Sequence, residues 1–183
     1  ATGAEQIALD DDALAITPQQ AVEDYVELLR QGSGSDLASQ FAEDTYRDRI
    51  FAQRKVLTDL AKESDGTYVD TIQPDMDHTY ALRTAEGGAL VIAPLEISSS
   101  FAVTGGAPVS VATSDEALLT GDPDDKVTHH YLDLVVLHIP ADVVAAEDGA
   151  SASPSPSAAG AAETAALPTV VAADHHLVRV TAD

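Results

Sequence analysis

The sequence predicts an α+β domain in which N-terminal helices pack on a curved antiparallel sheet of four to five strands. Apolar residues recur at helical spacing between Thr17 and Gly66, whereas apolar and polar residues alternate along most of the segments that follow. Each pattern places apolar side chains on one face of its element. A sheet curled around a long helix buries both kinds of face, so we expect helices and sheet to share one core.

Composition divides the chain into four segments. Residues 1–16 are acidic and only weakly periodic, which predicts a tail or a connector. Residues 17–145 hold the α+β domain. Residues 146–168 are rich in Ala, Ser and Pro and have almost nothing to bury, which predicts a flexible loop. Residues 169–183 predict a strand that completes the same domain.

The first helix begins with Thr17 as the N-cap and Pro18 at the first helical position, and the glycines after residue 31 end it. A short helix follows from Ser35 or Asp36. A longer helix over 45–65 presents one broad apolar face that must pack on another element. The residues on this face are Tyr46, Ile50, Gln53, Leu57, Leu60 and Ala61.

Strands are predicted over 67–72, 78–84, 89–103, 127–140 and 169–181. Residues 85–88, Ala-Glu-Gly-Gly, have the composition of a hairpin turn. Within 89–103 the odd-numbered positions are mostly apolar and the even-numbered ones include Glu and Ser, as in a half-buried antiparallel strand. Pro94 in this segment indicates an edge or a bulge. This order of helices and strands is also that of the NTF2-like and cystatin-like folds.

Composition excludes several classes of function. The formal net charge of −22, from 31 acidic and 9 basic residues, repels phosphate backbones and anionic membrane surfaces. We therefore expect no nucleic-acid partner. No run approaches the ~20 apolar residues that span a bilayer, so we expect no direct membrane insertion. The absence of cysteine excludes disulfides, thiolate metal sites and cysteine nucleophiles.

Three stretches, "TPQQAVEDYVELL", "FAEDTYRDRI" and "TYALRTAEGGALVIAPLE", resemble the carboxyl-terminal half of an uncharacterised lipoprotein family that is exported by high-GC Gram-positive bacteria. The resemblance runs over most of residues 17–140, and the hairpin "YALRTAEGGALV" is its most specific part. It implies an extracytoplasmic location at the cell envelope and a lipid-anchored parent protein whose amino-terminal half precedes this segment. It implies no activity.

The histidines do not predict a metal site. His130 and His138 share a face of one strand, but eight residues separate them by roughly 26 Å. One zinc ion, with ligand nitrogens about 2 Å away, cannot bind both. The adjacent pairs 129–130 and 175–176 each point to opposite faces, so each pair offers one ligand per face. Asp122, Asp124 and Asp125 suit weak calcium binding but lack the EF-hand spacing. We therefore expect no metal and no cofactor.

An acid–base site is the sharpest enzymatic hypothesis. Its candidate residues are Asp133 with His130 or His176, and its candidate hydrogen-bond donors are Tyr25 and Tyr131. The antiparallel pairing of 127–140 with 169–181 would bring Asp133 near His176. A carboxylate within hydrogen-bond reach of a histidine deep in a pocket would favour an isomerase, a lyase or a hydrolase. No GxSxG elbow or phosphate-binding glycine loop is present.

The sequence as a whole favours a non-enzymatic, extracytoplasmic module that binds an unknown protein or a small apolar ligand. An enzyme with an Asp–His pair in an NTF2-like pocket is one alternative, and a structural spacer is the other. These hypotheses differ in what they expect of the fold. Binding requires a pocket lined with apolar side chains, catalysis requires convergent polar groups in that pocket, and a spacer requires no pocket.

Overall fold

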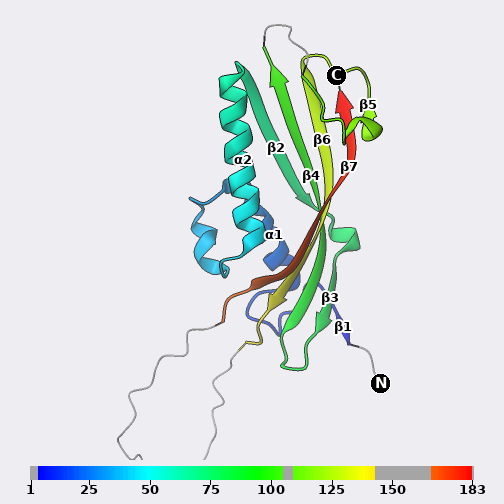
Figure 1. Cartoon of the computed structure of the whole chain (residues 1–183). Coiled ribbons are helices and arrows are strands. Elements are labelled where there is room, and N and C mark those ends of the chain that lie inside the picture. Colours follow the sequence, from blue (N-terminus) through cyan, green and yellow to red (C-terminus); the bar gives the residue numbers. More distant parts are fainter. Residues whose placement is uncertain (1–3, 105–108, 143–165, 183) are drawn as a thin grey trace, which may run out of the picture.

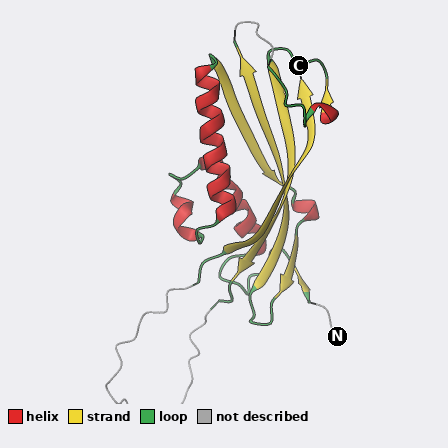
Figure 2. Ribbon diagram, in the orientation of Figure 1, coloured by secondary structure: helices red, strands yellow, loops and turns green. Residues whose placement is uncertain are grey.

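The computed structural model describes residues 4–104, 109–142 and 166–182. The described part is an open, strongly curled sheet with two α-helices on one face (Figures 1 and 2). This confirms the mixed helix and strand organisation, but the sheet has seven strands where the sequence predicts four to five. Two of the extra strands, β1 (Gln6–Ile7) and β5 (Leu119–Thr120), are two residues long, too short for any periodicity to show.

The longer strands are β2 (Gly66–Pro74), β3 (Tyr80–Arg83), β4 (Ala89–Val103), β6 (Lys126–Ile139) and β7 (Thr169–Ala182). Their order across the sheet is β1-β3-β4-β6-β7-β5, and β2 also pairs with β4. Neighbours are antiparallel except for β5 and β7, which are parallel. The two central strands β4 and β6 pair along almost their whole length, from Ala89 opposite Ile139 to Ala102 opposite Lys126. They form the spine of the sheet.

Pro94 lies in the middle of β4, where a strand normally tolerates no proline. Two strands pair with that edge of β4 one after the other. β3 pairs with residues 89–92 and β2 pairs with residues 95–103, so Pro94 lies opposite the break between these two strands. The carbonyl oxygen of Pro94 accepts a hydrogen bond from the backbone N–H of Asp75, which lies in the break. The missing N–H of Pro94 therefore costs the sheet no ladder bond.

The sheet has an inner face, which is turned toward the helices, and an outer face on the opposite side. On β6 the inner positions Asp133, Val135 and Leu137 are buried, whereas the outer positions Leu132 and Leu134 are 44% and 43% exposed. The odd-numbered residues of β4 from Ala89 to Ile97 are also buried on the inner face. This alternation agrees with the sequence prediction and places the core between sheet and helices.

Helix α1 (Pro18–Gln31) is the central helix of the core. Thr17 caps it by accepting a hydrogen bond from the N–H of Gln20, and Gly32 ends it with φ at 85°, a left-handed conformation that favours glycine. Its buried face packs on β2, β4 and β6. The residues on this face are Pro18, Ala21, Val22, Tyr25, Val26, Leu28 and Leu29.

Helix α2 (Thr45–Glu63) follows a short 3₁₀ helix, η1 (Asp36–Gln40), and packs mainly on β2. Tyr46 and Ile50 anchor its first half in the core, and Ala61 is buried near its end. At mid-helix, Arg54 pairs with Asp70 of β2 at 2.7 Å and donates to the carbonyl oxygen of Leu29 at 2.8 Å. Beyond this clamp the helix leads directly into the start of β2 (Figure 1), and Leu60 is 47% exposed.

The flanking segments take part in the fold where they are described. Within residues 1–16, predicted to be a tail or connector, Gln6–Ile7 form β1, and Ile7 and Leu14 are buried. Nearly all of the loop predicted over 146–168 lies outside the described residues. The strand predicted after it is β7, which pairs with β6.

Asp44 is the N-cap of α2, one residue before the Thr45 predicted from the sequence, and its carboxylate has two roles. It accepts a hydrogen bond from the N–H of Arg47 at 2.7 Å and another from the hydroxyl of the buried Tyr25 at 3.0 Å. Loss of the cap costs about 1 kcal/mol and an unpaired buried hydroxyl about 1–3 kcal/mol. We expect Asp44→Ala to lower the free energy of unfolding by about 2–3 kcal/mol in urea denaturation.

Asp48→Ala is the matched control, because it removes an exposed carboxylate from the same helical turn. We expect it to cost about 0.3–1 kcal/mol through the helix dipole alone. Equal losses for the two variants would contradict the role given to the Tyr25 hydroxyl.

Candidate functional site

Asp133 of β6 joins three elements of the fold and is completely buried. One carboxylate oxygen accepts a hydrogen bond from the hydroxyl of Tyr46 on α2 at 2.7 Å. The other oxygen lies 2.6 Å from Nδ1 of His175 on β7. A buried carboxylate is tolerated only when it is paired and hydrogen-bonded, and here both of its oxygens have a partner.

Both partners of Asp133 can act as hydrogen-bond donors to its carboxylate. A carboxylate only accepts hydrogen bonds, so against a carboxylate Nδ1 of His175 is the donor, and in that tautomer the lone pair lies on Nε2. Burial, followed by the charge of Asp133, raises the pKa of Tyr46 far above its usual range, so Tyr46 remains a donor. Within the described residues, Nε2 of His175 has no hydrogen-bond partner.

A β-bulge decides which histidine meets Asp133. His130 lies opposite Arg179, but the next residue of β6, Tyr131, lies opposite Leu177, so Val178 is an extra residue in β7. Uninterrupted pairing would place His176 opposite Asp133, as the sequence predicts. The bulge shifts the register by one, which brings His175 to the inner face and turns His176 to the outer face.

The structure does not bring His130 and His176 to Asp133. His130 is on the outer face, where its ring nitrogens lie 3.1 Å from the hydroxyls of Ser98 and Thr181. Burial, assisted by Arg179, lowers the pKa of His130, which favours the neutral ring. The side chain of His176 is 64% exposed and lies 2.9 Å from Asp174.

Three rings lie in a row along the inner face. The ring of Tyr131 stacks on that of His175, with centroids 4.4 Å apart and planes inclined by 18°. On its other side Tyr131 faces His129, with centroids 6.3 Å apart. Nε2 of His129 lies 3.5 Å from Asp115, so each end of the row has a carboxylate.

A cleft of about 590 Å³ opens between the second half of α2 and the inner face beside this row. Leu57 and Leu60 line it from the helix, and Phe101, Val127 and Tyr131 line it from the sheet. Among the described residues that line it there is no Asp, Glu, Lys or Arg, although the chain carries a net charge of −22. Cavities of this size and character commonly hold small molecules.

Hydroxyl groups gather on the floor of the cleft. The hydroxyl of Tyr68 donates to Ser99 at 3.1 Å, and the hydroxyl of Tyr131 has no partner among the described residues. Burial is the main cause that raises the pKa of both tyrosines, which keeps both phenols protonated. The floor therefore offers hydrogen-bond donors to an acceptor atom of a ligand.

A small hollow of about 10 Å³ lies beside the cleft, and His175 is among its lining residues. Gln53, Tyr68, Ser99 and Tyr131 line both spaces, and His175 lines only the hollow. The hollow is about the size of one water molecule. His175 thus lies just beyond the hydroxyl groups on the floor of the cleft.

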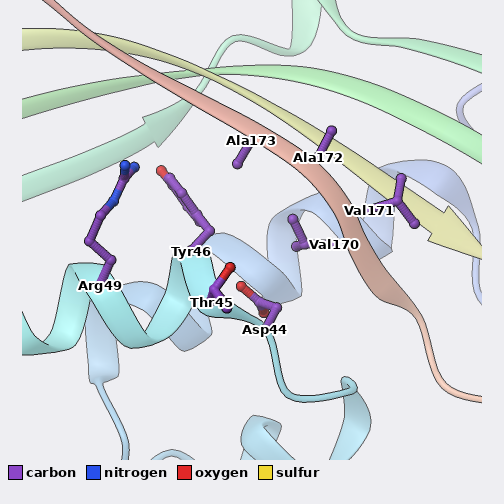
Figure 3. A pocket seen from close by; sticks show the side chains of 8 residues that line it. All are labelled: Asp44, Thr45, Tyr46, Arg49, Val170, Val171, Ala172 and Ala173. Carbon is purple, nitrogen blue, oxygen red and sulfur yellow. The ribbon is translucent and has the colours of Figure 1, made fainter.

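A second pocket, of about 280 Å³, lies between the start of α2 and residues 170–173 of β7. Figure 3 shows Tyr46 and Arg49 extending from α2 toward the sheet, with Asp44 and Thr45 at the start of the helix. The guanidinium of Arg49 lies 5.3 Å from the centroid of the Tyr46 ring. This pocket is polar, and Tyr46 is among its lining residues.

The other residues that the sequence singled out have separate positions. Tyr25 is engaged with Asp44 and packs edge-on against Phe41. Asp122, Asp124 and Asp125 are exposed, and within the described ranges no group of three or more His, Cys, Asp or Glu side chains is arranged to hold a metal ion.

Sequence reasoning missed the cleft, although the signal was present. The apolar face predicted for 45–65 continues through Leu57 and Leu60, and such a face requires a partner. In the structure Tyr46, Ile50 and Ala61 of that face are buried, whereas Leu57 is half-buried and Leu60 is exposed. Leu57 and Leu60 form one wall of the cleft.

The Tyr46–Asp133 bond can be tested by stability. Tyr46→Phe removes the hydroxyl and leaves one buried carboxylate oxygen without a partner, which costs about 1.5–3 kcal/mol. We expect urea denaturation to show a loss of that size. Tyr80→Phe removes a hydroxyl from a side chain that is 47% exposed and should leave stability unchanged. A Tyr46→Phe protein as stable as Tyr80→Phe would show that Asp133 does not depend on α2.

Comparison with known proteins identifies the family. A family model described as "Domain of unknown function (DUF8094)" matches residues 2–165. An "Uncharacterized lipoprotein" of Streptomyces avermitilis is 30% identical over 134 residues, which are 70% of this chain and 38% of that protein. No solved structure matches. Among the described residues, no helix is long and apolar enough to cross a membrane. The chain belongs to the DUF8094 family.

Proposed function

We propose that this domain binds a neutral, largely apolar small molecule in the cleft between α2 and the inner face of the sheet. The single observation that carries the proposal is the cleft itself, about 590 Å³ in volume and lined without a formal charge from Asp, Glu, Lys or Arg. A charged ligand would enter such a site without a counter-ion, which is costly. A neutral ligand instead gains by covering Leu57, Leu60 and Phe101.

The ligand carries at least one hydrogen-bond acceptor. The free hydroxyl of Tyr131 points to this requirement, together with the hydroxyl of Ser99, which accepts from Tyr68 and keeps its own proton to donate. A carbonyl oxygen meets such paired donors well. The ligand class that fits is therefore a neutral aromatic or alicyclic compound with a carbonyl or similar oxygen at one end.

The proposed location of the domain is the cell envelope. The name of the Streptomyces protein supports this location, because lipoproteins are attached to membranes through a lipid group. The chain spans 38% of that relative's length. For the fold, the proposal corresponds to an NTF2-like cone that encloses the cleft. The order of helices and strands supports it.

A neutral fluorescent dye tests the proposal. N-phenyl-1-naphthylamine brightens in apolar cavities, and the chain contains no Trp to interfere. We expect saturable binding to the wild-type domain. Leu60→Glu places a charge in the wall of the cleft and removes apolar contact, which should weaken binding about tenfold, the equivalent of about 1.4 kcal/mol.

Val56→Glu is the matched control. Val56 is 64% exposed on the same helix, one turn before Leu60, and does not line the cleft. It should bind the dye as the wild type does. Equal weakening by the two substitutions would place the dye on the helix surface. An absence of saturable binding to the wild type would overturn the proposal and favour the structural spacer.

A further inference from the structure

We propose that His175 is a general base at the inner end of the cleft and that the bound molecule undergoes proton transfer there. This inference rests on the proposed binding function. It differs from the non-enzymatic module that the sequence favours, because the structure contains what that hypothesis excluded: a carboxylate within hydrogen-bond reach of a histidine beside a pocket.

Asp133 prepares the histidine for this role as a positioning residue. It is fully buried and holds the proton of His175 on Nδ1, which leaves the lone pair of Nε2 free. The stacked ring of Tyr131 fixes the plane of the imidazole. The side chain of His175 is 21% exposed, so the nitrogen is neither sealed in the core nor fully solvated.

The hydroxyl groups next to His175 define the reaction class. A carbonyl oxygen that accepts from Tyr131 and Ser99 would place the adjacent C–H bonds of the ligand toward the small hollow that His175 lines. Nε2 takes a proton from the carbon next to the carbonyl, the C–H bond breaks, and its electron pair moves onto the carbonyl oxygen. In a ligand with a carbon–carbon double bond next to that carbon, the electron pair returns from the oxygen and the imidazolium gives the proton to the far end of the double bond. The double bond moves into conjugation with the carbonyl, so the net change is an isomerisation without a co-reactant.

His176 provides a control within the same strand. It differs from His175 by one position, points to the outer face and is 64% exposed. The bulge at Val178 is the reason that only one of the two adjacent histidines meets Asp133. Replacement of either histidine by Gln removes one imidazole, but only His175→Gln removes the base.

The probe is 5-nitrobenzisoxazole, a neutral flat aromatic whose reaction requires only a base. Loss of its ring C–H proton to Nε2 breaks the N–O bond and releases a coloured cyanophenolate. We expect saturable turnover by the wild-type domain. His175→Gln should reduce the rate at least about tenfold, since a positioned base contributes about 10²–10⁴-fold. His176→Gln should leave the rate unchanged.

The split between kcat and KM separates a positioned base from a structural histidine. Asp133→Asn removes the carboxylate that faces Nδ1 of His175, so kcat for the probe should fall at least about tenfold while KM and dye binding change little. The groups that face the imidazole are Asp133, Tyr46, Tyr131, Tyr68 and the Arg54–Asp70 ion pair, with Asp174 and His176 beside it in the chain.

Dye binding and circular dichroism accompany every variant, so that misfolding is not read as lost catalysis. A His175→Gln protein that is folded, binds the dye and turns over the probe as fast as the wild type overturns the base while leaving the binding proposal intact. Displacement of the dye by the probe without turnover does the same. Failure of the wild type to bind either compound overturns both proposals.

Discussion

The buried carboxylate of Asp133 is the constraint around which the rest of the structure is arranged. It ties α2 to β6 through Tyr46 and β7 to β6 through His175, and it is completely shielded from water. Removal of either partner leaves a charged oxygen unpaired in the core, which is far more costly than loss of an ordinary contact. The start of α2 and the middle of β7 are therefore held at fixed positions over the sheet.

The cleft is a consequence of that anchoring together with the curl of the sheet. Helix α2 is held at Tyr46, paired with β2 at Arg54 and joined directly to the start of β2, so it lies along β2 at one side of the curled sheet. The apolar residues beyond the clamp therefore stay apart from β4 and β6, and the uncovered surface becomes the wall and floor of a cavity.

The side chains of the inner face become more polar from the outer part of the cleft toward His175. Apolar side chains line the outer part of the cleft, hydroxyls of Tyr68, Ser99 and Tyr131 follow on the floor, and the His175–Asp133 pair lies at the inner end. Such an order orients a molecule that is apolar at one end and carries an oxygen at the other. The same order sets a base beside the hydrogen-bond donors, which connects the proposed binding with the proposed proton transfer.

The sequence by itself determined the helix boundaries near Thr17 and Gly32, the alternation along β4 and the opposite faces of adjacent histidines, because these depend on local backbone geometry. It could not show the two-residue strands, which lack periodicity, or the break opposite Pro94. Only the tertiary structure decided that Asp133 meets His175 and not His176, since one extra residue at Val178 shifts the register and carries no local signature. Only the tertiary structure left Leu57 and Leu60 uncovered, because the distance between a helix and a curled sheet is set by their packing together.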